Sequence, residues 1–123
     1  MMVSYFFDSY AFFEIIKGNP HYSKFSIYVS LITTKMNLME LYYWLLRRIG
    51  KVSAEKYYEK FLPYCIEISD DVIKKACEFR LKNKNKELSY IDCIGYIIAL
   101  EKEIKFLTGD EGFRDLDNVE FVK

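Results

Sequence analysis

The stretch Val3-Ser4-Tyr5-Phe6-Phe7-Asp8 is a short apolar run that ends at an acid. A run of this length with polar residues at its ends predicts a buried β-strand. Burying the carboxylate of Asp8 is costly unless it is paired, protonated or bound to a metal. Asp also caps helices and opens turns, and on its own Asp8 fits that structural role as well as it fits metal binding.

Three further acids lie within or directly after apolar stretches: Glu40, Asp92 and Asp110. No matching set of Lys or Arg residues is embedded beside the four acids, so salt bridges do not account for them. Four such carboxylates indicate a shared divalent cation. Because these ligands would be oxygen atoms, with no His or Cys among them, the cation expected is Mg²⁺ or Mn²⁺ and not zinc. A structural role stays open for Asp92 in the first turn of a helix and for Asp110 in a turn.

Segments with the patterns of strands and of helices alternate along the 123 residues. The predicted strands are 3–7, 27–33, 65–68, 104–108 and 119–122. The predicted helices are one between Asp8 and Gly18, 35–49, 53–62, one from Ser69 to the charged segment 82–87, and 89–103. Alternation of this kind favours a parallel sheet with helices on both faces. The fold class expected is therefore a three-layer α/β/α architecture, a single domain over 1–123 with a central parallel sheet of four to five strands.

Three segments carry more specific expectations. Segment 27–33 is continuous and rich in β-branched residues, which predicts a buried strand. The helix at 35–49 has apolar residues around nearly its whole circumference, so we expect it to be mostly covered. The helix at 53–62 opens with Ser53-Ala54-Glu55-Lys56, which is a capping-type start.

The predicted topology brings the four acids together. Asp8 and Asp110 each follow the carboxyl end of a predicted strand, and in open α/β sheets binding sites form at that edge. Helices that follow strands begin at the same edge, and Glu40 and Asp92 lie near the starts of such helices. The N-terminus of a helix also favours negative charge. We therefore expect all four carboxylates to point into one cleft.

Three more residues are candidates for supporting roles at this cleft: Ser9, Thr108 and Asp115. The hydroxyls of Ser9 and Thr108 could orient the carboxylates or an attacking water. Asp115 is a candidate fifth acid, and its register relative to the last strand is left open. A divalent cation lowers the pKa of a bound water and stabilises charge on a phosphodiester, so the reaction indicated is phosphodiester hydrolysis.

Composition and missing motifs exclude several other classes of protein. The net charge is zero, so the chain is not a generally basic nucleic-acid binder, and RNA contacts would come from local clusters. The sequence has no GxSxG, Walker, GxGxxG or CxxC pattern. The only histidine, His21, lies beside Pro20 in a predicted turn, where a surface role is expected. With no secretory signal and no apolar run near the roughly 20 residues that span a membrane, we expect a cytoplasmic protein.

The acids lie in four segments of the chain: FFDSYAFFEII (6–16), TTKMNLMELYYWLLRRIG (33–50), LSYIDCIGYIIALEKE (88–103) and IKFLTGDEGF (104–113). In this order the segments resemble the PIN-domain family of metal-dependent ribonucleases, and the small VapC-type toxins in particular. The resemblance runs over nearly the whole chain. Lys35 and Asn37, in the lead-in to Glu40, depart from the family's pattern.

The resemblance implies a Mg²⁺- or Mn²⁺-dependent endoribonuclease in which Asp8, Glu40, Asp92 and Asp110 carry metal binding and catalysis. It further implies the toxin of a type II toxin–antitoxin pair, which forms a homodimer and is held inactive by a small antitoxin protein. Two other functions stay open: a PIN nuclease that processes or matures RNA, and a PIN-like module that binds RNA or protein without cutting. A neighbouring gene for a short DNA-binding protein would separate the toxin from the processing enzyme.

Overall fold

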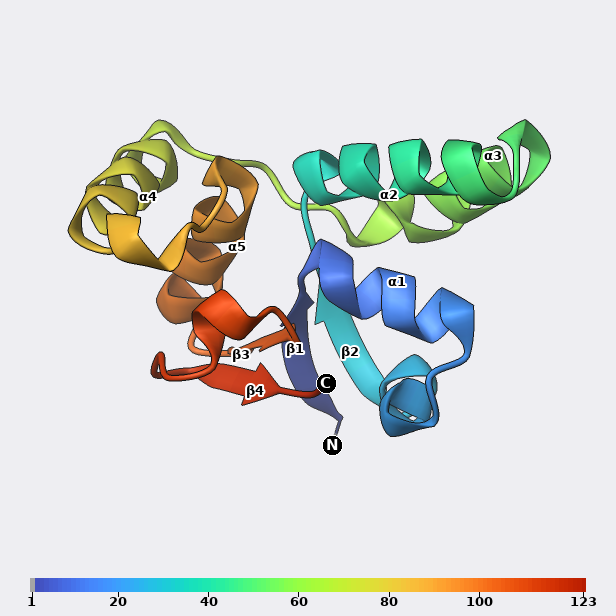
Figure 1. The fold of residues 1–123 in the computed structure, drawn as a ribbon, viewed down its shortest axis with the longest axis horizontal. Helices are drawn as coiled ribbons and strands as arrows, with labels where there is room; N and C mark the ends of the chain where they lie inside the picture. The colour runs from blue at the N-terminus through green and yellow to red at the C-terminus, as the bar shows by residue number, and fades with distance from the viewer. Residues whose placement is uncertain (1) are drawn as a thin grey trace.

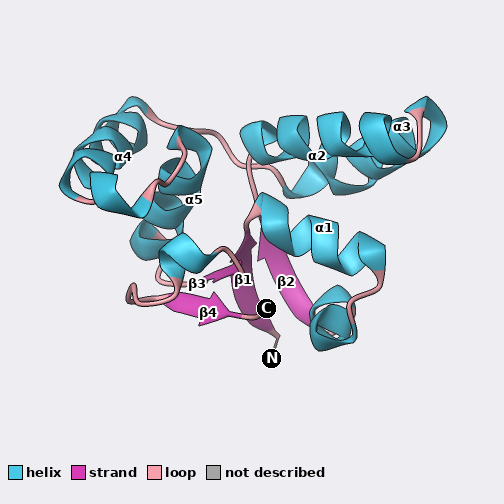
Figure 2. Ribbon diagram, viewed as in Figure 1, coloured by secondary structure: helices cyan, strands magenta, loops and turns pink. Residues whose placement is uncertain are grey.

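The computed structural model describes residues 2–123 and shows one parallel sheet with helices on both sides (Figures 1 and 2). The strand order is β2-β1-β3-β4, and every pairing is parallel. The strands are β1 (Val3–Phe7), β2 (Val29–Ile32), β3 (Lys105–Thr108) and β4 (Val119–Phe121). The main helices are α1 (Ser9–Lys17), α2 (Lys35–Arg48), α3 (Lys51–Phe61), α4 (Asp70–Lys82) and α5 (Tyr90–Glu101). Short 3₁₀ helices are η1 (Pro20–Ser26), η2 (Leu62–Tyr64), η3 (Lys84–Lys86) and η4 (Glu111–Phe113).

The two central strands bury apolar side chains on both faces of the sheet, because helices cover both faces. Phe6 and Phe106 face a core made with α4 and α5, and their rings stack with centroids 5.7 Å apart. Phe7 and Leu107 face the opposite core, made with α1, α2 and α3. Successive strand residues point to opposite faces, so a continuous apolar run serves both layers. The three-layer α/β/α prediction is confirmed.

Local signals in the sequence set several helix boundaries as predicted. The hydroxyl of Ser69 accepts from the backbone N–H of Val72 and caps α4. Ser89 caps α5 in the same way through the N–H of Asp92. Gly18 ends α1 in the left-handed conformation, with φ of 80°, which glycine adopts without strain.

Two predictions about strands are wrong. The segment 65–68 forms no strand, since only a single bridge joins Cys65 to Thr33 at the edge of the sheet. Strand β2 is shorter than 27–33 and is only partly buried, because it lies at the edge of the sheet, where it pairs with β1 alone among the strands of residues 2–123. Tyr28, directly before it, is 73% exposed.

Two predictions about helices are also wrong. Helix α2 has the predicted length but leaves an apolar face uncovered, with Met39, Tyr43 and Leu46 exposed. Helix α3 begins at Lys51, after Gly50, and no side chain caps it, so Ser53 lies inside the helix. The residues 2–123 contain no helix long and apolar enough to cross a membrane.

Candidate functional site

Asp8 lies at the carboxyl end of β1, at the N-cap position of α1, and its side chain is buried. Its side chain makes no capping hydrogen bond to α1, so a capping role does not explain it. Oδ2 accepts a hydrogen bond of 2.7 Å from the hydroxyl of Thr108. Oδ1 is the only buried side-chain N or O atom in residues 2–123 that has no hydrogen-bond partner. A buried acceptor without a partner costs free energy, and it marks a position where a donor or a cation is missing.

Thr108 joins Asp8 to Asp110. It ends β3, the neighbour of β1 in the sheet, and it is fully buried. Its hydroxyl donates to Asp8 and accepts from the backbone N–H of Asp110 at 3.1 Å. A parallel sheet aligns the carboxyl ends of its strands, and so one threonine hydroxyl contacts both acids.

Glu40 comes from α2, five residues after its first residue, Lys35, and it is half-buried. Its Oε1 accepts a hydrogen bond of 2.5 Å from the hydroxyl of Ser9, the first residue of α1. Ser9 follows Asp8 in the chain, so this bond holds the carboxylates of Glu40 and Asp8 at the same end of the sheet.

Asp92 and Asp110 each have a structural role as well. Oδ2 of Asp92 accepts from the backbone N–H of Ser89 at 2.9 Å, which completes a capping box at the start of α5. Oδ1 of Asp110 accepts from the N–H of Gly112 at 3.0 Å and caps η4. The structural interpretations left open for these two acids are therefore correct, and they leave the second oxygen of each carboxylate unexplained.

The four carboxylates lie close enough for their charges to act on one another. Burial raises the pKa of Asp8 well above its ordinary value, and the negative charges of Asp92 and Glu40 raise that pKa further. Burial and the charge of Asp92 likewise raise the pKa of Glu40. Burial and the charge of Asp110 raise the pKa of Asp92. These charge effects link the acids in pairs: Asp8 with Asp92 and Glu40, Glu40 with Asp92, and Asp92 with Asp110.

Asp115 and His21 lie outside this group. Asp115 is exposed, and its charge acts on Arg114, whose pKa is raised chiefly by Glu111. The exposed ring of His21 lies in η1 with Nδ1 3.2 Å from the carbonyl oxygen of Lys123. The structure does not bring Asp115 to the four acids.

The chemistry of the site fits a hard cation, although the ligands are not preassembled. In residues 2–123 no group of three or more His, Cys, Asp or Glu side chains is arranged to hold a metal ion as it stands. One oxygen of each carboxylate is anchored by a hydrogen bond from the protein. The unpartnered Oδ1 of Asp8 is a free oxygen ligand of the kind that Mg²⁺ and Mn²⁺ prefer.

Two polar residues at the site were not recognised from the sequence as functional. Asn37 is 1% exposed, and its amide nitrogen donates to the hydroxyl of Ser9 at 3.0 Å. Thr34 is fully buried and caps α2 by accepting from the backbone N–H of Asn37. Thr34 before the helix is a capping signal, but the separation of 28 positions between Ser9 and Asn37 hid their contact.

Solved structures similar to this one include toxins of known toxin–antitoxin systems. The sarcin–ricin-loop-cleaving toxin VapC20 of Mycobacterium tuberculosis is 19% identical, with a TM-score of 0.79 over 97% of this chain and 99% of that chain. A toxin–antitoxin complex from Klebsiella pneumoniae is 16% identical, with a TM-score of 0.74 over 93% of each chain. VapBC2 of Rickettsia felis, bound to a DNA fragment from its promoter, is 15% identical, with a TM-score of 0.72 over 98% of each chain. At these identities the likeness shows the fold.

The sequence itself matches one protein family. A search of curated proteins gives no significant match. The family model of the PIN domain matches residues 5–119, which include all four clustered acids. The chain belongs to the PIN domain family.

Proposed function

We propose that this protein is a metal-dependent endoribonuclease that cleaves RNA phosphodiester bonds and serves as the toxin of a type II toxin–antitoxin pair. The observation that carries the proposal is the buried, unpartnered Oδ1 of Asp8, a residue whose pKa is raised by burial and by the charges of Asp92 and Glu40. A buried carboxylate oxygen without a partner lowers the stability of the fold. A module that does not cut RNA has no use for such a group, which argues against a non-catalytic function. The toxin assignment draws on the family and on the fold shared with VapC20 and the toxin–antitoxin complexes.

Asp8, Glu40, Asp92 and Asp110 are the residues that would hold Mg²⁺ or Mn²⁺. When bound, such an ion activates a water and stabilises negative charge on a phosphodiester. The protein's part is to hold its ligands in place before substrate arrives. Thr108 fixes the Asp8 carboxylate and the backbone at Asp110, while Ser9 fixes Glu40. Supporting bonds of this kind orient the ligands, and losing one typically costs about 10- to 100-fold in metal affinity or activity.

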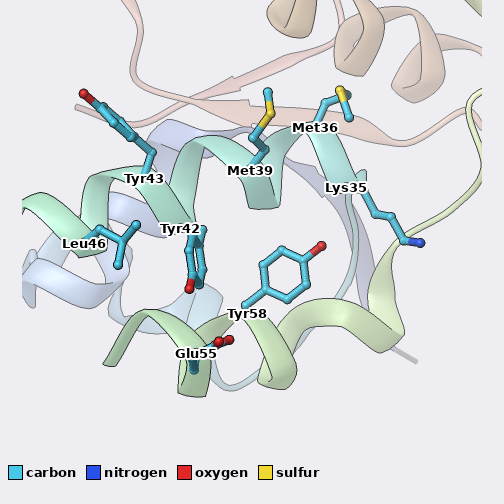
Figure 3. Close-up of a pocket in the computed structure, with 8 residues that line it drawn as sticks. All are labelled: Lys35, Met36, Met39, Tyr42, Tyr43, Leu46, Glu55 and Tyr58. Carbon is cyan, nitrogen blue, oxygen red and sulfur yellow. The ribbon is translucent and has the colours of Figure 1, made fainter. Parts of the chain in front are cut away.

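An exposed apolar groove supports the assignment of a protein partner. It has a volume of about 650 Å³ and lies between α2 and α3 (Figure 3). Met39, Tyr42 and Leu46 line it from α2, and Tyr58 lines it from α3. Tyr43 of α2, which also lines the groove, is 62% exposed. Such a surface is usual for an interface and unfavourable in water, so we assign it to the antitoxin, with a second copy of the chain as the other candidate.

Divalent metal should both stabilise the protein and switch on cleavage. A ligand that binds only the native state contributes about 2.7 kcal/mol when its concentration is 100-fold above Kd. We therefore expect millimolar Mn²⁺ or Mg²⁺ to raise the melting temperature, and RNA cleavage to require one of them and to stop in EDTA. The measurement is a thermal melt beside a gel assay on total RNA. A melting temperature that does not change with Mn²⁺, Mg²⁺ or EDTA, together with no RNA cleavage, would refute the metal site.

The histidine should not take part in cleavage. His21 is exposed, and its ring contacts a backbone carbonyl and none of the four acids. We expect His21→Ala to cut RNA at a rate within a few-fold of the parent's. A large loss of activity in a variant that melts like the parent would show that His21 contributes to the reaction.

A further inference from the structure

A chain of hydrogen bonds runs from the start of α2 to the Glu40 carboxylate. The hydroxyl of Thr34 donates to Oδ1 of Asn37 at 2.7 Å. Nδ2 of Asn37 donates to the hydroxyl oxygen of Ser9 at 3.0 Å, and that hydroxyl donates to Oε1 of Glu40 at 2.5 Å. Thr34, Asn37 and Ser9 are all buried, so the two bonds among them are shielded from water, and the bond from Ser9 to Glu40 is part-buried.

The number of hydrogens available for donation fixes which group donates and which accepts in each of these bonds. A hydroxyl has one hydrogen to donate. Thr34 gives its hydrogen to the amide oxygen of Asn37, which leaves the amide nitrogen facing Ser9. Because Ser9 accepts from that nitrogen, its own hydrogen is directed to Glu40. Asn37 thereby selects the orientation of the only hydrogen bond donor that the described residues supply to Glu40.

Glu40 needs such a fixed donor. Its side chain has several rotatable bonds, and the negative charge of Asp92 repels its carboxylate. The hydroxyl of Ser9, the residue that follows Asp8, holds the Glu40 carboxylate against that repulsion. Removing Asn37 would free Ser9 to turn toward another acceptor.

The side chain of Asn37 is separable from the capping of α2. The cap is a bond from the backbone N–H of Asn37 to the hydroxyl of Thr34, and a substitution of the side chain leaves that N–H in place. The bonds of the amide to Thr34 and Ser9 can thus be removed while the helix start is kept.

We propose that Asn37 is a positioning residue that acts through Ser9 to hold Glu40 in the orientation in which it binds a divalent cation. The proposal rests on the proposed function, since it takes Glu40 as a metal ligand. Asn37 is not itself a ligand or a catalytic residue.

Mn²⁺ affinity is the decisive measurement, because it does not depend on cleavage. The free Mn²⁺ signal in electron paramagnetic resonance gives Kd for the native protein. We expect Asn37→Ala to raise Kd by about 10- to 100-fold, the usual effect of losing a residue that orients a metal ligand. Ser9→Ala should raise Kd similarly. The double variant, with both Asn37 and Ser9 replaced by Ala, should have a Kd no higher than that of the worse single variant, because both changes break the same series of hydrogen bonds.

Asn19→Ala is a matched control. The amide of Asn19 also donates to a buried glutamate, Glu14, at 2.8 Å, but that pair lies at the end of α1 with Lys17. The control should keep the parent's Kd for Mn²⁺ and the parent's rate of cleavage. If Asn37→Ala does not fold, Asn37→Val fills the site with an apolar side chain of similar size and should show the same loss.

The outcomes separate the two proposals. A parent protein that binds no Mn²⁺ overturns the proposed function, and this inference with it. A parent that binds Mn²⁺ with the same Kd as a folded Asn37 variant overturns the inference alone. Full additivity of the losses in the Asn37 and Ser9 variants would show that Asn37 does not act through Ser9. A purely structural role would lower the melting temperature in EDTA and leave Kd unchanged.

Discussion

Asp8→Asn is expected to abolish RNA cleavage while leaving the metal-free protein as stable as the parent, or more stable. The loss of activity should exceed the roughly 10- to 100-fold that follows the loss of a supporting residue, because Asp8 is proposed as a direct ligand. The gain in stability has a separate cause. In the parent, the buried carboxylate of Asp8 has an oxygen without a partner and is repelled by Asp92 and Glu40. An asparagine keeps an oxygen for Thr108 and removes the buried charge.

The same argument predicts how stability depends on pH. The pKa of Asp8 is raised in the folded protein, so the fold favours the protonated acid. The ionised carboxylate of Asp8 destabilises the fold. This effect is absent below the pKa that Asp8 has in the unfolded protein, which is about 4, and it grows as the pH rises from there to the raised pKa of Asp8 in the folded protein. The raised pKa values of Glu40 and Asp92 act with the same sign. In EDTA, the parent should therefore melt at a lower temperature at pH 8 than at pH 5, and Asp8→Asn should show a smaller change.

Thermal melts of parent and variant at several pH values, in EDTA and in Mn²⁺, measure both effects. Asp70→Asn serves as the matched control, because Asp70 is an exposed acid in the first turn of α4. It should change neither cleavage nor the response to Mn²⁺. The account of Asp8 would be wrong if Asp8→Asn melted well below the parent in EDTA, or if it still gained stability from Mn²⁺ as the parent does.

Much of the fold could be predicted because its signals are local. The run that ends at Asp8 gives β1, and the polar residues Ser69 and Ser89 mark helix starts where they stand. The acids at strand ends indicated a common edge: Asp8 directly follows β1, Asp110 follows β3, and one threonine hydroxyl, that of Thr108, contacts the Asp8 carboxylate and the backbone of Asp110. That all four acids share a cation stays a prediction. The order of the strands in the sheet is not a local property and was not predicted.

The errors have a common physical cause. An apolar residue in the sequence predicts burial, but it does not show which surface covers that residue. Ile66 and Ile68 pack against the core near α5 without pairing in the sheet, and so an apolar run was mistaken for a strand. Met39 and Tyr43 on α2 are exposed, and no element of residues 2–123 covers them. Side-chain contacts such as that between Ser9 and Asn37 depend on how α1 packs on α2, which no local pattern reports.

Gly109→Ala is expected to have the largest effect on stability of any single added methyl group near the site. Gly109 is buried between Thr108 and Asp110. A Cβ there would collide with the backbone carbonyl oxygen of Val122 and with the ring of Tyr10. Overpacking a tight site typically costs about 1–3 kcal/mol, and the upper end applies where the obstacle is backbone.

The Val122 carbonyl cannot move aside easily, because it is held from two directions. Its oxygen accepts a hydrogen bond of 2.6 Å from the hydroxyl of Tyr22, which is fully buried. The N–H of the same residue donates to the carbonyl of Thr108 at 2.9 Å. Relief of the collision must therefore displace either these bonds or the segment that carries Thr108 and Asp110. We expect Gly109→Ala to lower the free energy of unfolding by about 3 kcal/mol and to reduce cleavage.

Gly112→Ala, in the same loop, separates the collision from a general effect of replacing glycine. Its Cβ would lie 2.6 Å from Cδ2 of Leu88, the end of a flexible side chain, and 3.1 Å from the carbonyl oxygen of Lys86. Because a side-chain end can shift more easily than the backbone carbonyl of Val122, which two hydrogen bonds hold, we expect this variant to lose less than half as much stability, measured by urea denaturation in EDTA. Equal losses in the two variants would contradict the role given to Val122. Thr108 links Asp8 to the segment that carries Asp110. If Gly109→Ala cuts RNA more slowly than the parent at temperatures where the variant is fully folded, the collision has displaced that segment.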